Sequence, residues 1–295
     1  MRMAGFPALF RSADEASDRK QRLYLGLVGV EYGLLLLAAI FSMDFAKTSF
    51  FYMVYAGLFF ISIAILLTRA LLKPQQEWYR CRALAESVKT LTWRYMMRAK
   101  PFDDASKFAV ARAAFREQLH QLFTANKATA QMIAHDWSAD DQITKDMDDF
   151  RALPLEERKA RYEAERIRDQ RTWYAQKARY NRGQIKIWVS LGVICYVLAA
   201  LLALGRILRP NWEFWPIEPV IVIVCSLIGW MQIKKFSELA AAYTVTAHEI
   251  GLISPKLDAV QTESELSDFV NEAEQAFSRE HTMWIARRTD YYNCS

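Results

Sequence analysis

Four long apolar stretches, set in strongly charged sequence, constrain the fold of this chain more than any other feature. A helix rises about 1.5 Å per residue, so about 20 apolar residues cross the roughly 30 Å hydrocarbon core of a membrane. Each stretch has about that length and is apolar all round, whereas a helix of a soluble core keeps a polar stripe. We therefore interpret the four as membrane spans: Tyr24–Met43, Phe50–Thr68, Ile187–Leu204 and Ile217–Ile233.

Short linkers join these spans in pairs. Asp44–Ser49 separates the first two spans and Gly205–Pro216 separates the second two. Lysine and arginine are frequent before the first and third spans and after the second and fourth, whereas the two linkers contain few of them. Because basic flanks stay on the cytoplasmic side, we expect both termini and the long middle region in the cytoplasm. The first apolar stretch is too long for a cleaved signal peptide.

The remaining sequence is helical in character. No glycine occurs from residue 69 until Gly183, and no segment shows the alternation of a strand. Pro154, followed by two glutamates, suits the first turn of a helix that can run unbroken into the third span. The run Thr262-Glu-Ser-Glu-Leu predicts the start of the last helix. We predict an all-α integral membrane protein with two transmembrane helical hairpins, four spans in all, and long cytoplasmic helical extensions.

The chain has the layout of a tandem repeat. Each half contains a short basic helix, a hairpin and a long helix that follows the second span, and the segments Arg82–Trp93 and Ser237–His248 occupy the same place in the two halves. We predict a first two-span unit at residues 1–125, a connecting segment at 126–152 and a second two-span unit at 153–295.

Glu31 is the ionisable residue that lies well inside a span. Counted from Tyr24 it is about 10 Å deep, where a carboxylate needs a helix partner or a wet cavity. Two interpretations remain open: a pore-lining or gating group, and an interhelical hydrogen bond. The glycines of the same span favour close helix packing or oligomerisation. The candidate pore or assembly residues are Glu31, Gly26, Gly29 and Gly33.

The chain offers no pattern that indicates catalysis or a bound group. It has no phosphate-binding loop, no nucleophile elbow and no zinc-binding helix motif, and its cysteines and histidines lack ligand spacing. We expect no enzyme activity, no cofactor and no metal. Aromatic and His/Glu residues outside the spans fit contacts within a cytoplasmic helical bundle instead. These candidate contacts are Trp173, Tyr174, His248, Glu280, His281 and Trp284.

The basic residues flank the spans and form no separate patch, which favours anionic lipid headgroups over nucleic acid as their partner. We therefore expect the lipid bilayer as a partner and no nucleic acid.

Three strings resemble one family in particular. They are ALAESVKTLTWRYMMRAKPFDD (Ala83–Asp104), ALPLEERKARYEAERIRDQRTWYAQKARYNR (Ala152–Arg182) and the tail from Ala240 to Arg288 with its Arg-Glu-His-x-x-Trp run. They are similar to the SLATT superfamily, the SMODS- and SLOG-associated transmembrane effector domains, here in tandem. The resemblance covers almost the whole chain and marks no catalytic residue.

The resemblance implies a bacterial inner-membrane effector of an anti-phage or conflict system. Such an effector is expected to form a homo-oligomer and a pore or channel after a nucleotide or partner signal. We expect no sensor region in this sequence, because no strand–glycine pattern of a nucleotide-binding domain occurs outside the spans. Either a sensor or nucleotide-producing partner protein then supplies the signal, or the cytoplasmic helices bind it directly. The alternative is a structural or scaffolding membrane protein that recruits a soluble partner. A constitutive transporter is disfavoured, because the spans hold few polar groups.

Overall fold

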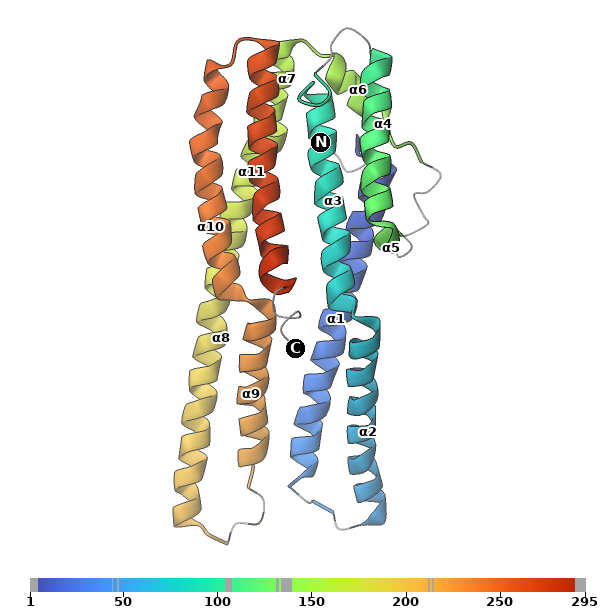
Figure 1. Cartoon of the computed structure of the whole chain (residues 1–295). Helices are drawn as coiled ribbons and strands as arrows, with labels where there is room; N and C mark the ends of the chain where they lie inside the picture. Colours follow the sequence, from blue (N-terminus) through green and yellow to red (C-terminus); the bar gives the residue numbers. More distant parts are fainter. Residues whose placement is uncertain are drawn as a thin grey trace. The chain divides into compact units, whose positions relative to one another are not determined.

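The computed structural model describes residues 5–43, 45–46, 48–103, 108–130, 133, 140–211, 213 and 215–289. Of residues 128, 130 and 278–289 it describes the backbone but not the side chains. Across these residues the regular structure is helical and contains no strand, which confirms the predicted all-α fold. The chain divides into two compact units (Figure 1). The hairpin unit comprises Arg22–Pro74 and Lys177–Ala241; the bundle unit comprises Met1–Gln21, Gln75–Gln176 and Ala242–Ser295. Each unit therefore takes segments from both halves of the chain.

The hairpin unit is built from four helices that are long and apolar enough to cross a membrane, as predicted. Stacked rings join the first pair, with the Phe41 and Phe51 centroids 4.9 Å apart, and Trp188 lies against Trp230 in the second pair. The side chain of Thr48 caps the start of the second helix by accepting a hydrogen bond from the amide of Phe51. The helices are α1 (Ala8–Phe41), α2 (Ser49–Leu72), α8 (Asp169–Leu208) and α9 (Ile217–Lys234).

A further helix follows each hairpin at once, but a single lysine interrupts the path. Lys73 alone separates α2 from α3 (Pro74–Met96), and Lys235 alone separates α9 from α10 (Phe236–Ile253). Both lysines adopt the left-handed conformation, with φ of 43° and 50°. A proline disfavours helical geometry in the residue before it, which accounts for the first break. No local residue preference accounts for the second one.

The helix predicted from Pro154 into the third span is continuous but not regular. α7 (Leu155–Tyr162) passes into η3 (Glu163–Arg168), a π-helical segment, and then into α8. In a π-helix the backbone bonds reach one residue further than in an α-helix, and such turns occur frequently at functional sites. The sequence carries no signal that would have predicted it.

The bundle unit packs its helices around one hydrophobic core. α3 contributes side chains such as Leu84, Val88 and Trp93, Phe6 contributes from just before α1, and Phe10 contributes from its first turn. The other elements are α4 (Phe108–Ala125), α5 (Lys127–Ala130), α6 (Lys145–Ala152), α7, α10, η4 (Ser254–Ala259) and α11 (Glu263–Thr289).

The predicted start of the last helix is confirmed. Glu265 donates its amide hydrogen to the Thr262 hydroxyl at 3.2 Å, and its carboxylate accepts from the Thr262 amide at 3.1 Å. This reciprocal pair is a capping box. The backbone amides of Gln261 and Thr262 bond to the Glu265 carboxylate and lower its pKa.

Candidate functional site

Glu31 is paired with Arg69 inside the first hairpin. A guanidinium nitrogen of Arg69, in the last turn of α2, donates to the Glu31 carboxylate, and the two side chains are 25% and 20% exposed. The Arg69 guanidinium also lies over the ring of Tyr24, 5.8 Å from its centroid. A basic residue is favourable at the carboxyl end of a helix, so α2 helps to hold the cation there. The structure thus shows an interhelical contact of Glu31, while a pore-lining or gating role of this residue stays a prediction.

The three glycines of α1 lie on the other side of that helix. Successive residues turn by about 100°, so Gly26, Gly29 and Gly33 point roughly opposite to Glu31. All three are exposed, and a Cβ built on any of them would meet no atom within 4 Å. Glu31 and the glycines therefore form two different surfaces of α1, one facing α2 and the other not covered by any described residue.

The glycine at which close approach matters is Gly229 on α9. A Cβ at this position would overlap with the hydroxyl of Tyr32 on α1. Gly229 therefore lets the first and second hairpins touch through Tyr32 within the hairpin unit. In the sequence, Gly229 is one small residue within an apolar stretch. The close contact with Tyr32 could not be predicted from it, because that contact depends on which helix packs against α9.

The structure places three of the candidate bundle contacts in two environments. Trp173 and Tyr174 both lie against Tyr243 of α10, with ring centroids 5.6 and 5.7 Å away. His248 of α10 is exposed. The side chains of Glu280, His281 and Trp284, although on α11, lie outside the described residues.

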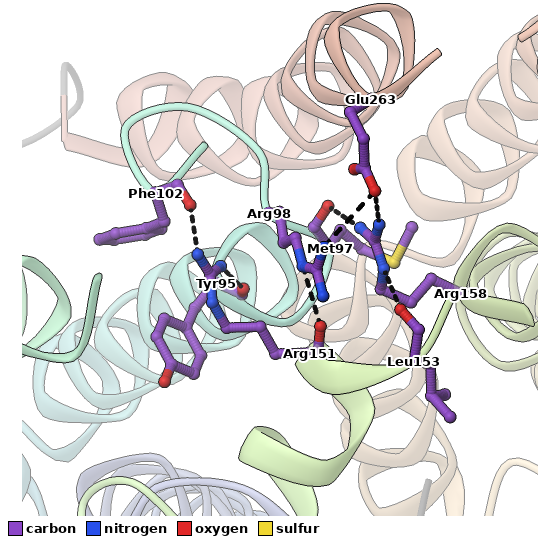
Figure 2. Close-up of polar contacts among 8 residues, drawn as sticks. All are labelled: Tyr95, Met97, Arg98, Phe102, Arg151, Leu153, Arg158 and Glu263. Carbon is purple, nitrogen blue, oxygen red and sulfur yellow. Dashed lines mark hydrogen bonds and ion pairs between the residues drawn. The ribbon is translucent and has the colours of Figure 1, made fainter. Parts of the chain in front are cut away.

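A cluster of arginines holds the turn that follows α3 (Figure 2). Arg151 donates to the carbonyl oxygens of Tyr95 and Phe102 at 2.6 and 2.8 Å. Arg158, which is fully buried, donates to those of Leu153 and Met97 and also pairs with Glu263. Burial lowers the pKa of Arg151. Because these arginines donate to main-chain carbonyl oxygens, we interpret the cluster as one that stabilises the fold.

A second buried network joins η3 to α11. Arg166 donates from Nε and Nη2 to the two carboxylate oxygens of Glu274, at 2.8 and 2.6 Å, and the Tyr162 hydroxyl donates to the same carboxylate at 2.9 Å. Burial and the neighbouring Glu274 carboxylate raise the pKa of Tyr162 well above its usual value. Burial opposes the charge of Arg166, but Glu274 more than offsets it and raises the pKa of the guanidinium. Sequence reasoning missed this network.

A signal for it exists in the sequence. Arg158, Tyr162 and Arg166 are spaced by four residues, so they share one face of a helix, and all three are buried. Among the described residues, no group of three or more His, Cys, Asp or Glu side chains can hold a metal ion.

Two apolar helical hairpins and a helical bundle define an all-helical membrane protein. Two related domain patterns match it: SMODS and SLOG-associating 2TM effector domain 3 at residues 7–159, and SMODS and SLOG-associating 2TM effector domain 1 at residues 162–284. The chain belongs to the SLATT superfamily and carries two of its domains in tandem. Neither a curated protein nor a solved structure matches it.

Proposed function

We propose that the chain is a membrane effector that assembles into a homo-oligomer and opens an ion-conducting pore in the bacterial inner membrane as part of anti-phage defence. The family is named for effector domains with two transmembrane helices, which supports the effector role. The observation that carries the pore is the uncovered glycine face of α1. Small residues let helices of neighbouring copies approach closely in lipid, and among the described residues no atom lies within 4 Å of a Cβ built on these glycines.

The proposed mechanism uses the helices that belong to both units. α1 and α8 pass without a chain break from the bundle unit into the hairpin unit. A displacement of these helices in the bundle unit is thereby carried into the spans. The Glu31–Arg69 pair would hold the hairpin in its closed arrangement and separate when the pore opens.

The test is ion leakage from vesicles that contain the purified protein and an ion-sensitive dye. We expect leakage that rises more steeply than the protein-to-lipid ratio, because several copies must meet. Gly33→Leu fills the uncovered face and should abolish leakage. Gly57→Leu on α2 is the matched control, since its Cβ also meets no atom within 4 Å. Tight vesicles at every ratio, together with an unchanged membrane potential in expressing cells, would overturn the proposal.

A scaffold that recruits a soluble partner is the second candidate. α4 of the bundle unit exposes large apolar side chains, at Phe108, Val110 and Phe123. Such side chains suit a protein contact. Cell toxicity that survives deletion of both hairpins would favour this function over a pore.

A further inference from the structure

The second hairpin carries a half-buried cation that no described carboxylate neutralises. Lys234, the last residue of α9, makes no ion pair or hydrogen bond within the part of the chain that the structure describes. Its ammonium nitrogen lies over the ring of Trp230, 5.2 Å from the ring centroid. The face of an aromatic ring offsets only part of the cost of removing a cation from water. The cation therefore still needs an anion.

The cation at the matching end of the first hairpin does have its anion. Arg69, in the last turn of α2, also lies over an aromatic ring, that of Tyr24, but it pairs with Glu31 as well. Lys234 has the ring and lacks the carboxylate. Each hairpin thus places a cation over an aromatic ring, and only in the first does a described residue supply the counter-charge.

A second polar group lies at the same end of the second hairpin. Trp188 of α8 and Trp230 of α9 are in ring contact, with centroids 6.4 Å apart. Gln184 and Lys234 are each four residues from one of these tryptophans, on the side away from the loop between the two helices. Because the helices run antiparallel and side by side (Figure 1), both residues lie about 6 Å beyond the tryptophan pair and on the same face.

Gln184 has hydrogen-bond donors available at this place. Its side-chain carbonyl oxygen accepts from Nε1 of Trp188 at 3.0 Å, which fixes the amide group beside the indole ring. The amide nitrogen of Gln184 donates to no residue that the structure describes. Lys234 and Gln184 therefore offer an ammonium group and an amide N–H group next to two indole rings. Donors of this kind bind the oxygen atoms of a phosphate group.

We propose that Lys234 and Gln184 bind the phosphate of an anionic phospholipid headgroup, with the rings of Trp188 and Trp230 against the glycerol part of the lipid. Tryptophan rings gather at the level of the headgroups in membrane proteins, and anionic lipids attract basic residues next to a span. The lipid phosphate at this site supplies the counter-charge that Glu31 supplies in the first hairpin.

The site is more specific than the general attraction between basic flanking residues and anionic lipid. Lys235, the very next residue, pairs with Glu238 at 3.1 Å and so already has its anion. Two adjacent lysines therefore have unequal roles, although both carry the same charge. The inference goes beyond the proposed pore and does not depend on it.

The experiment measures lipid binding to the full chain purified in a neutral detergent. The melting temperature is followed during titration with phosphatidylglycerol, phosphatidylcholine or inorganic phosphate, and native mass spectrometry counts the bound lipids. We expect phosphatidylglycerol to stay bound and to raise the melting temperature, whereas the other two probes have a much smaller effect. Lys234→Met should weaken the binding of phosphatidylglycerol by about fivefold, the effect of one lysine at an anionic membrane surface.

Lys235→Met is the matched control, because it removes the same charge one residue away and should bind phosphatidylglycerol as the unaltered chain does. Gln184→Glu keeps the acceptor for Trp188 and gives Lys234 a carboxylate from its own chain. This variant should melt later than the unaltered chain without lipid and lose most of its response to phosphatidylglycerol. The melting temperature without lipid also checks that each variant folds.

Four results would each overturn the inference. They are equal weakening by Lys234→Met and Lys235→Met, equal binding of the two lipids, a response to inorganic phosphate as large as that to phosphatidylglycerol, and an unchanged lipid response of Gln184→Glu. The first result would leave only a general attraction to anionic lipid, and the third would indicate a site for free phosphate.

Discussion

Arg166 and Glu274 form a two-point ion pair in the core of the bundle unit, with side chains 2% and 0% exposed. The pair joins the π-helical segment η3 to α11, and Tyr162 donates a third hydrogen bond to the same carboxylate. The net stabilisation from such a buried ion pair is small, because burying both charges costs free energy. Removing one partner costs much more, because the other charge then stays buried without a counter-charge.

Removing one partner of this pair should strongly destabilise the bundle unit. Glu274→Leu leaves the Arg166 charge buried, and we expect a loss of about 3–5 kcal/mol in the free energy of unfolding. The double variant Arg166→Met with Glu274→Leu should lose less than the single one. Denaturant unfolding in detergent measures both, with Glu272→Leu as the exposed control on the same helix. Equal losses for single and double variants would contradict the argument.

The ion pair between Glu31 and Arg69 predicts a similar pattern in the hairpin unit. Glu31→Gln or Arg69→Gln alone should reduce stability by about 1–3 kcal/mol, since each leaves a partly buried charge without its partner. Changing both to glutamine should cost less than the sum of the two. Thermal unfolding in detergent provides the measurement, and Glu218→Gln at an exposed position of α9 is the control. Additive losses would show that the two side chains do not interact.

Gly229 and the glycines of α1 should respond differently to alanine. Gly229→Ala places a methyl group against the Tyr32 hydroxyl and should cost about 1–3 kcal/mol. Gly29→Ala adds the same methyl group where nothing lies within 4 Å, so the stability of the single chain should not fall. The test compares melting temperatures of the two variants, and Tyr32→Phe should relieve part of the Gly229→Ala loss. Similar losses for both glycines would refute the assignment.

Glycine should be more stable than lysine at the two left-handed positions that follow α2 and α9, Lys73 and Lys235. A side chain in this conformation costs about 1–2 kcal/mol, and glycine avoids that cost. Lys73→Gly and Lys235→Gly are expected to raise the free energy of unfolding by about 1 kcal/mol, whereas Lys73→Ala and Lys235→Ala should not. A gain with alanine as large as with glycine would point to the lost charge, not the backbone, as its cause.

The capping box of α11 predicts a pH dependence. Because backbone amides lower the pKa of Glu265 in the folded chain, its stabilising effect is complete above the ordinary carboxyl pKa of 4.5 and is lost as the pH falls through the lowered value. Glu265→Ala should therefore melt earlier than the unaltered chain at pH 6, and the difference should shrink toward pH 3. A difference that stays constant with pH would exclude the carboxylate as its source.

The sequence alone determined the spans, their pairing in hairpins and the start of α11, because each depends on residues that are close along the chain. Apolar length decides what can cross a membrane, and Thr262 and Glu265 cap their own helix. The side-chain pairs that the structure adds join residues far apart in the sequence: Glu31 with Arg69, Gly229 with Tyr32, and Arg166 with Glu274. Only tertiary packing brings these partners together. The local sequence permits many side-chain pairs, and the helix packing decides which charged or small residues lie opposite each other.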